Sequence, residues 1–131
     1  LRTVELPFED GIALAGQAVD ERVRPGGVLH VALRWRVDAK PQGDYNVFFH
    51  LTDLSGQIVA QRDSIPANGT RPTSHWEPGT VVADNHGLRL PDDLAAGEYA
   101  ARVGLYDPRS GQRVKTQSGE DQIVLATVEV R

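Results

Sequence analysis

The residues most able to take part in chemistry lie in and beside one long loop, residues 64–79. They are a tryptophan, a histidine, an arginine and two flanking aspartates: Trp76, His75, Arg71, Asp63 and Asp84. A tryptophan in an otherwise polar loop can offer its flat apolar face to the C–H groups of a sugar ring, and charged neighbours can bond the hydroxyl groups. The pattern therefore predicts a ligand-binding site, with a glycan as the ligand.

The same loop has a second interpretation. It contains three prolines and two glycines and shows no hydrophobic periodicity. A connection this long is usually either functional or ordered by its own side chains. In the second case Trp76 would fold down as a plug that holds the loop onto a sheet, while Asp63 and Arg71 bond loop amides. We favour the plug, because an irregular loop must satisfy its own backbone groups.

Signatures of catalysis and of metal binding are missing from the sequence. It has no G-x-S-x-G motif, no Gly-rich phosphate loop and no cysteine, and its histidines lack the short spacings typical of metal ligands (His30, His50, His75 and His86). Calcium would need oxygen ligands, but no D-x-D-x-D-G loop supports the aspartates that follow strands (Asp44, Asp53, Asp63 and Asp84). We predict no catalytic residue, no metal and no cofactor, with an unrecognised hydrolase as the alternative to a non-enzyme.

Composition limits the class of protein. The chain has 131 residues, enough for one domain with a real core, and a formal net charge of -4. Lys and Arg are scattered, which argues against a nucleic-acid partner. No apolar run is long enough to span a bilayer. Because the sequence opens with Leu1 and lacks Met, we expect residues 1–131 to be a single domain excised from a longer chain. Asn68 begins a possible N-glycosylation acceptor.

The elements that must position these residues are β-strands. Segment 44–63 reads as a hairpin, because Tyr45, Val47, Phe49 and Leu51 recur at every second position before a Gly-containing turn. Phe48 adds an apolar group on the second face. The hairpin is therefore expected to be central and covered on both sides.

Further alternating segments follow the same rule. Inward-facing residues are expected in 28–37 (Leu29, Val31, Leu33, Trp35 and Val37), in 97–107 (Tyr99, Ala101, Val103 and Leu105) and in 123–130 (Val124, Ala126, Val128 and Val130). Glycines and prolines separate these runs at fairly regular intervals. The pattern predicts an all-β fold, a two-layer antiparallel β-sandwich of about seven to nine strands.

One short motif indicates an immunoglobulin-like sandwich. Asp93-x-x-x-Gly97-x-Tyr99 resembles the tyrosine corner, in which a Tyr at the start of a late strand bonds to the backbone just upstream. The alternative is a core aromatic beside a turn. The corner is favoured because the hydroxyl group of a half-buried Tyr needs a partner.

Several motifs taken together resemble a known accessory domain. The segments are Tyr45–Asp53 with Gly56, the Pro72-Thr73…Trp76-x-Pro78-Gly79 loop with Asp84, and Gly97-x-Tyr99 with the run 103–107. Over residues 8–130 the sequence resembles the soluble β-sandwich that follows the membrane region of bacterial glycosyltransferases similar to dolichyl-phosphate-mannose-protein mannosyltransferases. The resemblance implies an extracytoplasmic domain on the outer face of the cytoplasmic membrane. It carries over no catalytic residue, because those belong to the membrane part.

Two functional hypotheses follow. The first is a non-catalytic accessory domain that binds a glycan or an envelope partner through loop 64–79. The second is a structural spacer that binds no small molecule and docks against the membrane part of its own parent or against a neighbour.

Overall fold

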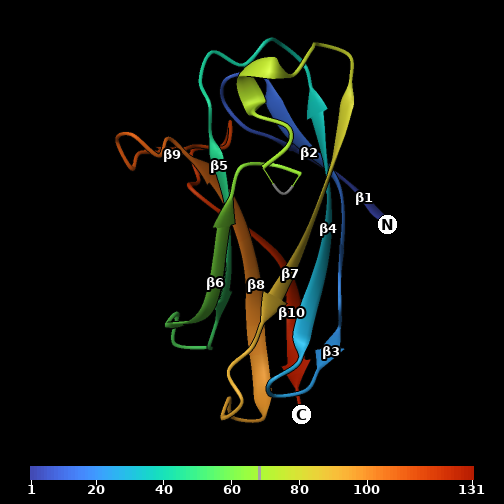
Figure 1. Cartoon of the computed structure of the whole chain (residues 1–131), viewed down its shortest axis with the longest axis vertical. Helices are drawn as coiled ribbons and strands as arrows, with labels where there is room; N and C mark the ends of the chain where they lie inside the picture. The colour runs from blue at the N-terminus through green and yellow to red at the C-terminus, as the bar shows by residue number, and fades with distance from the viewer. Residues whose placement is uncertain (68) are drawn as a thin grey trace.

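Ten strands and one short 3-10 helix form two packed sheets in the computed structural model, which describes residues 1–67 and 69–131 (Figure 1). The four-stranded sheet has the order β1 (Arg2–Pro7), β2 (Ile12–Val19), β4 (Val28–Val37) and β7 (Val81–Arg89). The six-stranded sheet has the order β3 (Arg22–Val23), β10 (Ile123–Val130), β8 (Gly97–Tyr106), β5 (Asn46–Thr52) and β6 (Ile58–Ser64), with β9 (Arg113–Val114) beside β8. The predicted all-β sandwich is confirmed. Asn68, the possible glycosylation acceptor, lies outside the described residues.

The strand count and pairing differ slightly from the prediction. Two of the strands, β3 and β9, are only two residues long, which is too short for an alternating pattern to reveal. β1 was also not predicted. Every pair is antiparallel except β3 with β10, which run parallel.

The core forms where the two sheets turn their apolar faces to each other. All five inward residues expected in β4 are buried, and so are Val47, Phe49 and Leu51 of β5 on the facing sheet. Full burial of one such side chain contributes about 1.5–3 kcal/mol before the cost of ordering the chain. In β4 and β5, the alternation of apolar residues therefore identifies the face that points inward.

The central hairpin is confirmed in part. β5 and β6 pair antiparallel, and Phe48 is 2% exposed, so β5 is covered on both faces. β5 lies between β8 and β6, but β6 is the edge strand of its sheet. The central position predicted for the second strand was wrong. Its polar second half, including Arg62 and Asp63, is typical of an edge strand, where charge discourages pairing with another chain.

The inward series predicted for β10 was wrong at Val124. This side chain is 56% exposed, whereas its neighbours Ile123 and Leu125 are buried. The register of β10 against β8 shifts between Val124 and Ala126. A β-bulge at this point offsets the alternation by one residue, and Val128 and Val130 then face inward as expected.

Two glycines in the segment 8–19 allow the backbone to pack closely or to change register. Gly11 has φ 77, and a Cβ atom there would lie 2.3 Å from the carbonyl oxygen of Ala39, so only glycine allows this close approach. Gly16 follows a register shift that begins at Leu14 in the pairing of β2 with β4. Close backbone approaches and bulges are the usual reasons for a glycine within a strand region.

The tyrosine corner is confirmed. Tyr99 is buried at the start of β8, and its hydroxyl group donates a hydrogen bond of 2.7 Å to the carbonyl oxygen of Ala95. This contact ties the connection before β8 to the strand and supports the immunoglobulin-like assignment.

Tyr99→Phe tests the contribution of the corner. The variant keeps the buried ring and loses only the hydrogen bond, so the free energy of unfolding should fall by about 0.5–1.5 kcal/mol. Urea unfolding followed by circular dichroism should show a lower midpoint with an unchanged slope. An unchanged midpoint would leave Tyr99 as an ordinary core aromatic.

Candidate functional site

The described residues of loop 64–79 lie at one end of the sandwich and are held there by their own side chains (Figure 1). It contains the 3-10 helix η1 (Thr73–His75). The buried hydroxyl group of Thr73 donates to the carbonyl oxygen of Gly43 at 2.6 Å and accepts from the amide of Tyr45 at 3.0 Å. Asp44 accepts from the amide of Ser74, and hydrogen bonds from the side chain and backbone of Ser74 lower the pKa of Asp44. These contacts fix the loop to the start of β5.

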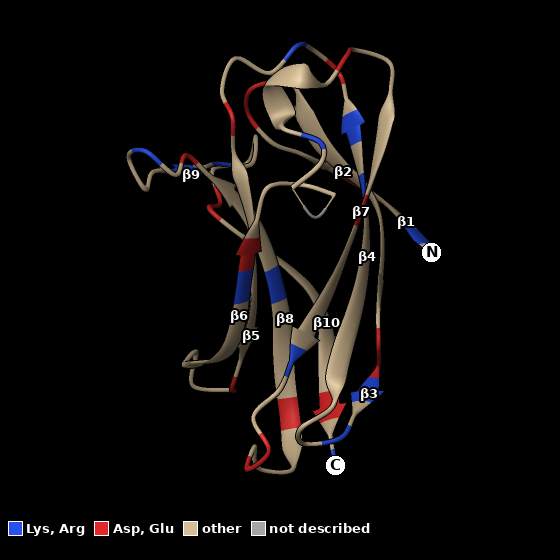
Figure 2. Ribbon diagram, viewed as in Figure 1, with Lys and Arg blue, Asp and Glu red and all other residues tan. Residues whose placement is uncertain are grey.

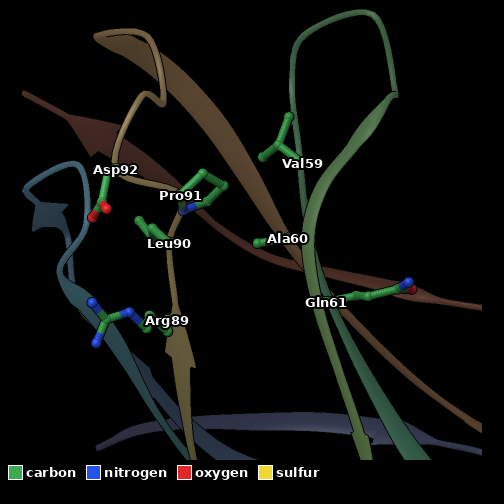
Figure 3. Close-up of a pocket in the computed structure, with 7 residues that line it drawn as sticks. All are labelled: Val59, Ala60, Gln61, Arg89, Leu90, Pro91 and Asp92. Atoms are coloured by element: carbon green, nitrogen blue, oxygen red, sulfur yellow. The ribbon is translucent and has the colours of Figure 1, made fainter.

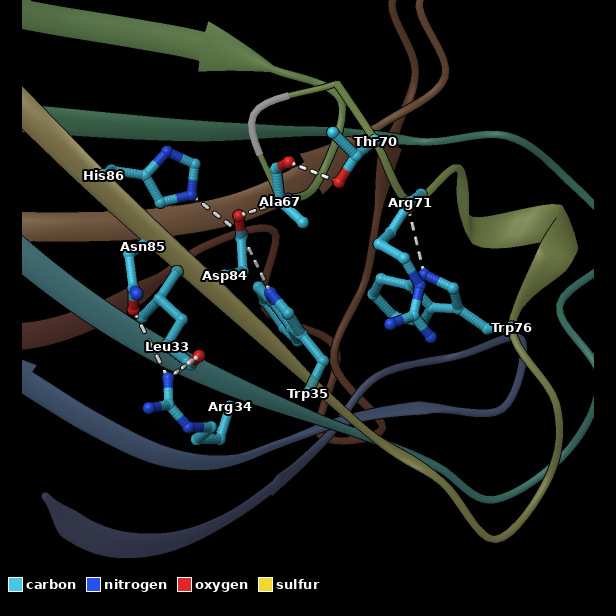
Figure 4. Close-up of polar contacts among 10 residues, drawn as sticks. All are labelled: Leu33, Arg34, Trp35, Ala67, Thr70, Arg71, Trp76, Asp84, Asn85 and His86. Carbon is cyan, nitrogen blue, oxygen red and sulfur yellow. Dashed lines mark hydrogen bonds and ion pairs between the residues drawn. The ribbon is translucent and has the colours of Figure 1, made fainter.

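Trp76 is the centre of this packing. Its side chain is 0% exposed and belongs to the hydrophobic core, and its Nε1–H donates to the carbonyl oxygen of Arg71 at 3.0 Å (Figure 4). A stacking platform for a sugar needs an open ring face, and this ring offers none in this conformation. The geometry fits the alternative in which Trp76 is a plug.

Asp84 is a buried hub that joins three segments. Its Oδ2 accepts from Nε1 of Trp35 at 3.1 Å and lies 2.8 Å from Nε2 of His86, while its Oδ1 accepts from the amide of Ala67 at 2.7 Å (Figure 4). The side chains of Asp84 and His86 are both fully buried. Burial by itself raises the pKa of Asp84, but the hydrogen bond and charge of His86 with the two N–H donors outweigh it, so the pKa is lowered. A charged Asp84 thus links β4, β7 and loop 64–79.

Sequence reasoning did not foresee this network, although a signal was present. Val82, Asp84, His86 and Leu88 occupy alternate positions of β7, and all four are buried. The alternation that placed Val82 and Leu88 in the core also places the two polar residues there. From the sequence, Asp84 was predicted to bind a ligand and was also considered as a calcium ligand, and His86 was considered only as a possible metal ligand.

The remaining predicted site residues lie elsewhere. Asp63 is exposed on β6 and accepts a hydrogen bond of 2.9 Å from the hydroxyl group of Tyr106. Arg71 and His75 are exposed on the loop. Since Trp76 and Asp84 point into the core and Asp63 lies on the outer face of the six-stranded sheet, the five residues do not converge on one site. Whether Asp63, Arg71 or His75 contacts a ligand stays a prediction.

A different set of polar side chains does converge, on the outer face of the six-stranded sheet. Its cleft has a volume of about 310 Å³ and is lined by His50, Thr52, Gly56, Ile58, Arg102, Arg113 and Gln122. The even-numbered residues of β5 point away from the core, and His50 lies directly opposite Arg102 in the pairing of β5 with β8. The β5–β6 turn and the segment around β9 complete the walls. We refer to these seven residues as the outer-face cleft.

Phe48 packs against Gly104, and Arg113 lies over the Phe48 ring on one wall of the cleft. A Cβ atom at residue 104 would collide with the Phe48 ring, so glycine lets the ring pack closely against β8. The guanidinium carbon of Arg113 lies 4.3 Å from the centre of that ring, a cation–π contact, and its Nη1 lies 3.5 Å from the carboxylate of Asp121. Arg113 is therefore held over the sheet by two contacts.

Contacts within the sheet also fix Arg102, and burial determines the protonation state of His50. Nε of Arg102 donates to the hydroxyl group of Thr52 at 3.1 Å. Burial, together with the charge of Arg113, lowers the pKa of His50 against the opposite influence of Asp63. His50 is therefore neutral at neutral pH, with one ring nitrogen able to donate and the other able to accept a hydrogen bond.

Three other hollows lack this convergence. One of about 410 Å³ lies between β6 and the end of β7, but the Gln61 side chain points away from Arg89 and Asp92 (Figure 3). A second, of about 430 Å³ on the outer face of the four-stranded sheet, contains His30 and Asp20, which pair with each other. The largest, about 570 Å³, is a groove between β1 and the segment 116–124.

The distribution of charge (Figure 2) and the placement of metal-ligating residues do not indicate a further site in the described residues. Positive and negative residues are spread over both sheets and the loops (Figure 2). Within the described part of the chain, no three His, Asp or Glu side chains are grouped in a way that could hold a metal ion. None of the helical segments in residues 1–67 and 69–131 has the length and apolar character needed to cross a membrane.

Comparison with known proteins shows the fold. No protein-family model and no curated protein sequence matches the chain. Among solved structures, the C-terminal domain of Wzt is similar over 96% of this chain and 77% of that one, with a TM-score of 0.66 and 13% identity. The alkylpurine DNA glycosylase AlkC of Pseudomonas fluorescens, bound to DNA with an abasic site analog, is similar over 92% of this chain and 30% of that one. The TM-score is 0.58 and the identity 12%. A β-glucosidase from Listeria innocua in complex with glucose is similar over 91% of this chain and 16% of that one, with a TM-score of 0.53 and 14% identity.

These likenesses define a class of fold and nothing finer. At such low identity they show that the same sandwich occurs in chains of very different sequence. This chain spans most of the Wzt domain but only a small part of the two enzymes. The same architecture therefore occurs both as a C-terminal domain and as one segment of larger proteins.

Proposed function

We propose that this sandwich is a non-catalytic accessory domain that binds a glycan in the outer-face cleft. The observation that carries the proposal is the convergence of imidazole, hydroxyl, guanidinium and amide groups in one cleft of about 310 Å³, from His50, Thr52, Arg102, Arg113 and Gln122. A pocket of this size lies at the lower end of the range for small-molecule sites. Groups that both donate and accept hydrogen bonds suit a hydroxyl-rich ligand.

The recurrence of the fold supports an accessory role. It forms a C-terminal domain in Wzt, and it makes up only a small part of a β-glucosidase whose structures contain glucose or laminaribiose. The sequence resemblance supports a parent that is a bacterial membrane glycosyltransferase, with this domain outside the cytoplasmic membrane. Several hydrophobic spans upstream in the full reading frame would support that placement, and their absence would remove it.

Glycan binding should depend on the cleft and not on loop 64–79. We expect the purified domain to bind members of a glycan array, and Gln122→Ala to weaken the binding about tenfold, because a lost hydrogen bond of about 1 kcal/mol or more changes affinity by that order. His75→Ala is the control, since His75 is exposed on the loop predicted from sequence. Calorimetry on an array hit measures both variants. The reverse result would place the ligand on the loop.

A structural role is the second candidate, and one observation favours it. The groove of about 570 Å³ has an apolar part formed by Leu6, Pro7, Ile123 and Val124. Grooves of this kind suit docking against another protein surface. If no glycan in a broad panel binds the domain, the binding proposal fails and the spacer or docking role becomes the better account.

A further inference from the structure

We propose that the outer-face cleft recognises an anionic group, a carboxylate or a phosphate, carried by its ligand. The inference deepens the proposed function, because it names the chemical class of the glycan that the same cleft would take. Acidic sugars and phosphorylated sugars both carry such groups, and the experiment below separates them.

The cleft is rich in positive charge and in hydrogen-bond donors. Its seven lining residues include two arginines and no carboxylate, although the whole chain has a net charge of -4. Three carboxylates near the cleft already have partners, since Asp63 accepts from Tyr106, Asp121 pairs with Arg113 and Glu120 accepts from Ser118. A local excess of positive charge in a concave site attracts an anion even when the protein as a whole is negative.

Arg102 is the residue best placed to hold the anion. It is half-buried on β8, and its Nε is directed at the hydroxyl group of Thr52. Among the described residues, its two terminal nitrogens have neither a hydrogen-bond acceptor nor a carboxylate partner. A guanidinium group fixed at Nε with both terminal N–H₂ groups available has the fork that binds carboxylate or phosphate oxygens in pairs.

Arg113 adds charge from the opposite wall. Its Nη1 atom lies 3.5 Å from Oδ2 of Asp121, which is long for an ion pair. The side chain of Arg113 is 35% exposed and that of Asp121 is 53% exposed. An exposed ion pair of this kind is weak, so it leaves much of the positive charge of Arg113 available to a bound anion. The Phe48 ring keeps the guanidinium over the sheet whether or not an anion is present.

His50 provides a pH dependence that an unrelated anion site would not share. The charged groups that face it are Arg102 of β8, Arg113 of β9 and Asp63 of β6, with Asp121 behind Arg113. Its pKa lies below the usual value, so lowering the pH through that pKa adds a third positive charge to the cleft. Affinity for sulfate, whose own charge is constant over this range, should therefore rise as the pH falls from neutral.

Matched pairs of ligands test the inference with the wild-type domain alone. Galacturonate and galactose differ in the carboxylate, and glucose 6-phosphate and glucose differ in the phosphate. We expect NMR titration to show that each acidic member binds about 10- to 100-fold more tightly than its neutral partner, as for a hydrogen-bonded charge pair. Shifts should centre on His50 and Gln122. Equal binding of both members overturns the inference and leaves glycan binding intact.

Variants test the residue that we assign to the anion. Arg102→Gln should lose most of the preference for the acidic sugar, and Arg102→Lys should keep part of it because the charge remains. Arg34→Gln is the matched control on the other sheet, where Arg34 bonds Asn85 and the carbonyl oxygen of Leu33. A preference unchanged in Arg102→Gln, or lost equally in Arg34→Gln, overturns the assignment.

Inorganic phosphate separates the two proposals. If phosphate and both acidic sugars bind equally well and neutral sugars do not bind, the anion site stands while recognition of a glycan fails. If no anionic probe binds at millimolar concentration, the inference is wrong, whatever the neutral sugars do.

Discussion

Replacing Trp76 by alanine is expected to lower the free energy of unfolding by about 3–5 kcal/mol, the range for removing a large buried aromatic side chain. The whole ring is inside the hydrophobic core, so the substitution leaves a cavity beneath loop 64–79. It also removes the only side-chain donor that holds the carbonyl oxygen of Arg71 in the described structure. Urea unfolding followed by circular dichroism measures the loss.

Two further variants separate a plug from a binding platform. Trp76→Phe keeps much of the apolar volume and loses the indole N–H, so its loss should be clearly smaller than that of the alanine variant. His75→Ala, next in sequence but exposed, should change stability by no more than about 0.5 kcal/mol. If Trp76→Ala were as stable as the wild type and had lost glycan binding, the ring would be a sugar platform after all.

The fold was predictable because strand alternation is local information. Leu29 to Val37 and Val47 to Leu51 each show within one segment which face is apolar, and both faces are buried as expected. The error at Val124 has a different origin. A bulge depends on how β10 meets β8, and nothing within residues 123–130 shows that pairing in advance.

The outer-face cleft was beyond sequence reasoning for a similar reason. His50, Arg102 and Arg113 belong to three strands, and only the pairing of β5 with β8 and of β8 with β9 brings them together. One sequence signal did point to this face: Phe48 breaks the polar side of its strand, which predicted cover there. The structure supplies that cover through Arg113 and the segment near Asp121.

Loop 64–79 shows how a correct observation can support two opposite readings. A tryptophan among polar residues signals either a ring exposed for binding or a ring buried to hold the loop. The sequence cannot measure burial, and burial decides between them. The ring of Trp76 is buried in the core, and the loop amide of Ala67 bonds to Asp84, so both contacts fix the loop to the core.

The second of these contacts gives the other large effect: Asp84→Ala should destabilise the fold by about 3–5 kcal/mol, because it removes a fully buried carboxylate on which several hydrogen-bond donors depend. The carboxylate accepts from Trp35 and Ala67 and contacts Nε2 of His86. Its removal leaves these buried donors without an acceptor, and each unsatisfied group adds to the loss. The effect should exceed that of a surface aspartate such as Asp93, for which Asp93→Ala is the control.

The charge of Asp84 can be separated from its shape by Asp84→Asn and by pH. The amide keeps an oxygen acceptor but cannot be ionised, so Asp84→Asn should be less damaging than Asp84→Ala. The pKa of Asp84 is lowered in the folded state, so its ionisation stabilises the fold fully above the unfolded value of about 3.9. That contribution is lost as the pH falls through the folded pKa.

The difference in unfolding free energy between the wild type and Asp84→Asn should therefore shrink as the pH falls below about pH 4. Taking the difference removes the contributions of other carboxylates with lowered pKa values, such as Asp44 and Asp53, because they are the same in both proteins. Urea unfolding at a series of pH values measures it. A difference that stays constant down to pH 3 would mean that Asp84 is held by the geometry of its hydrogen bonds, with no net stabilisation from its charge.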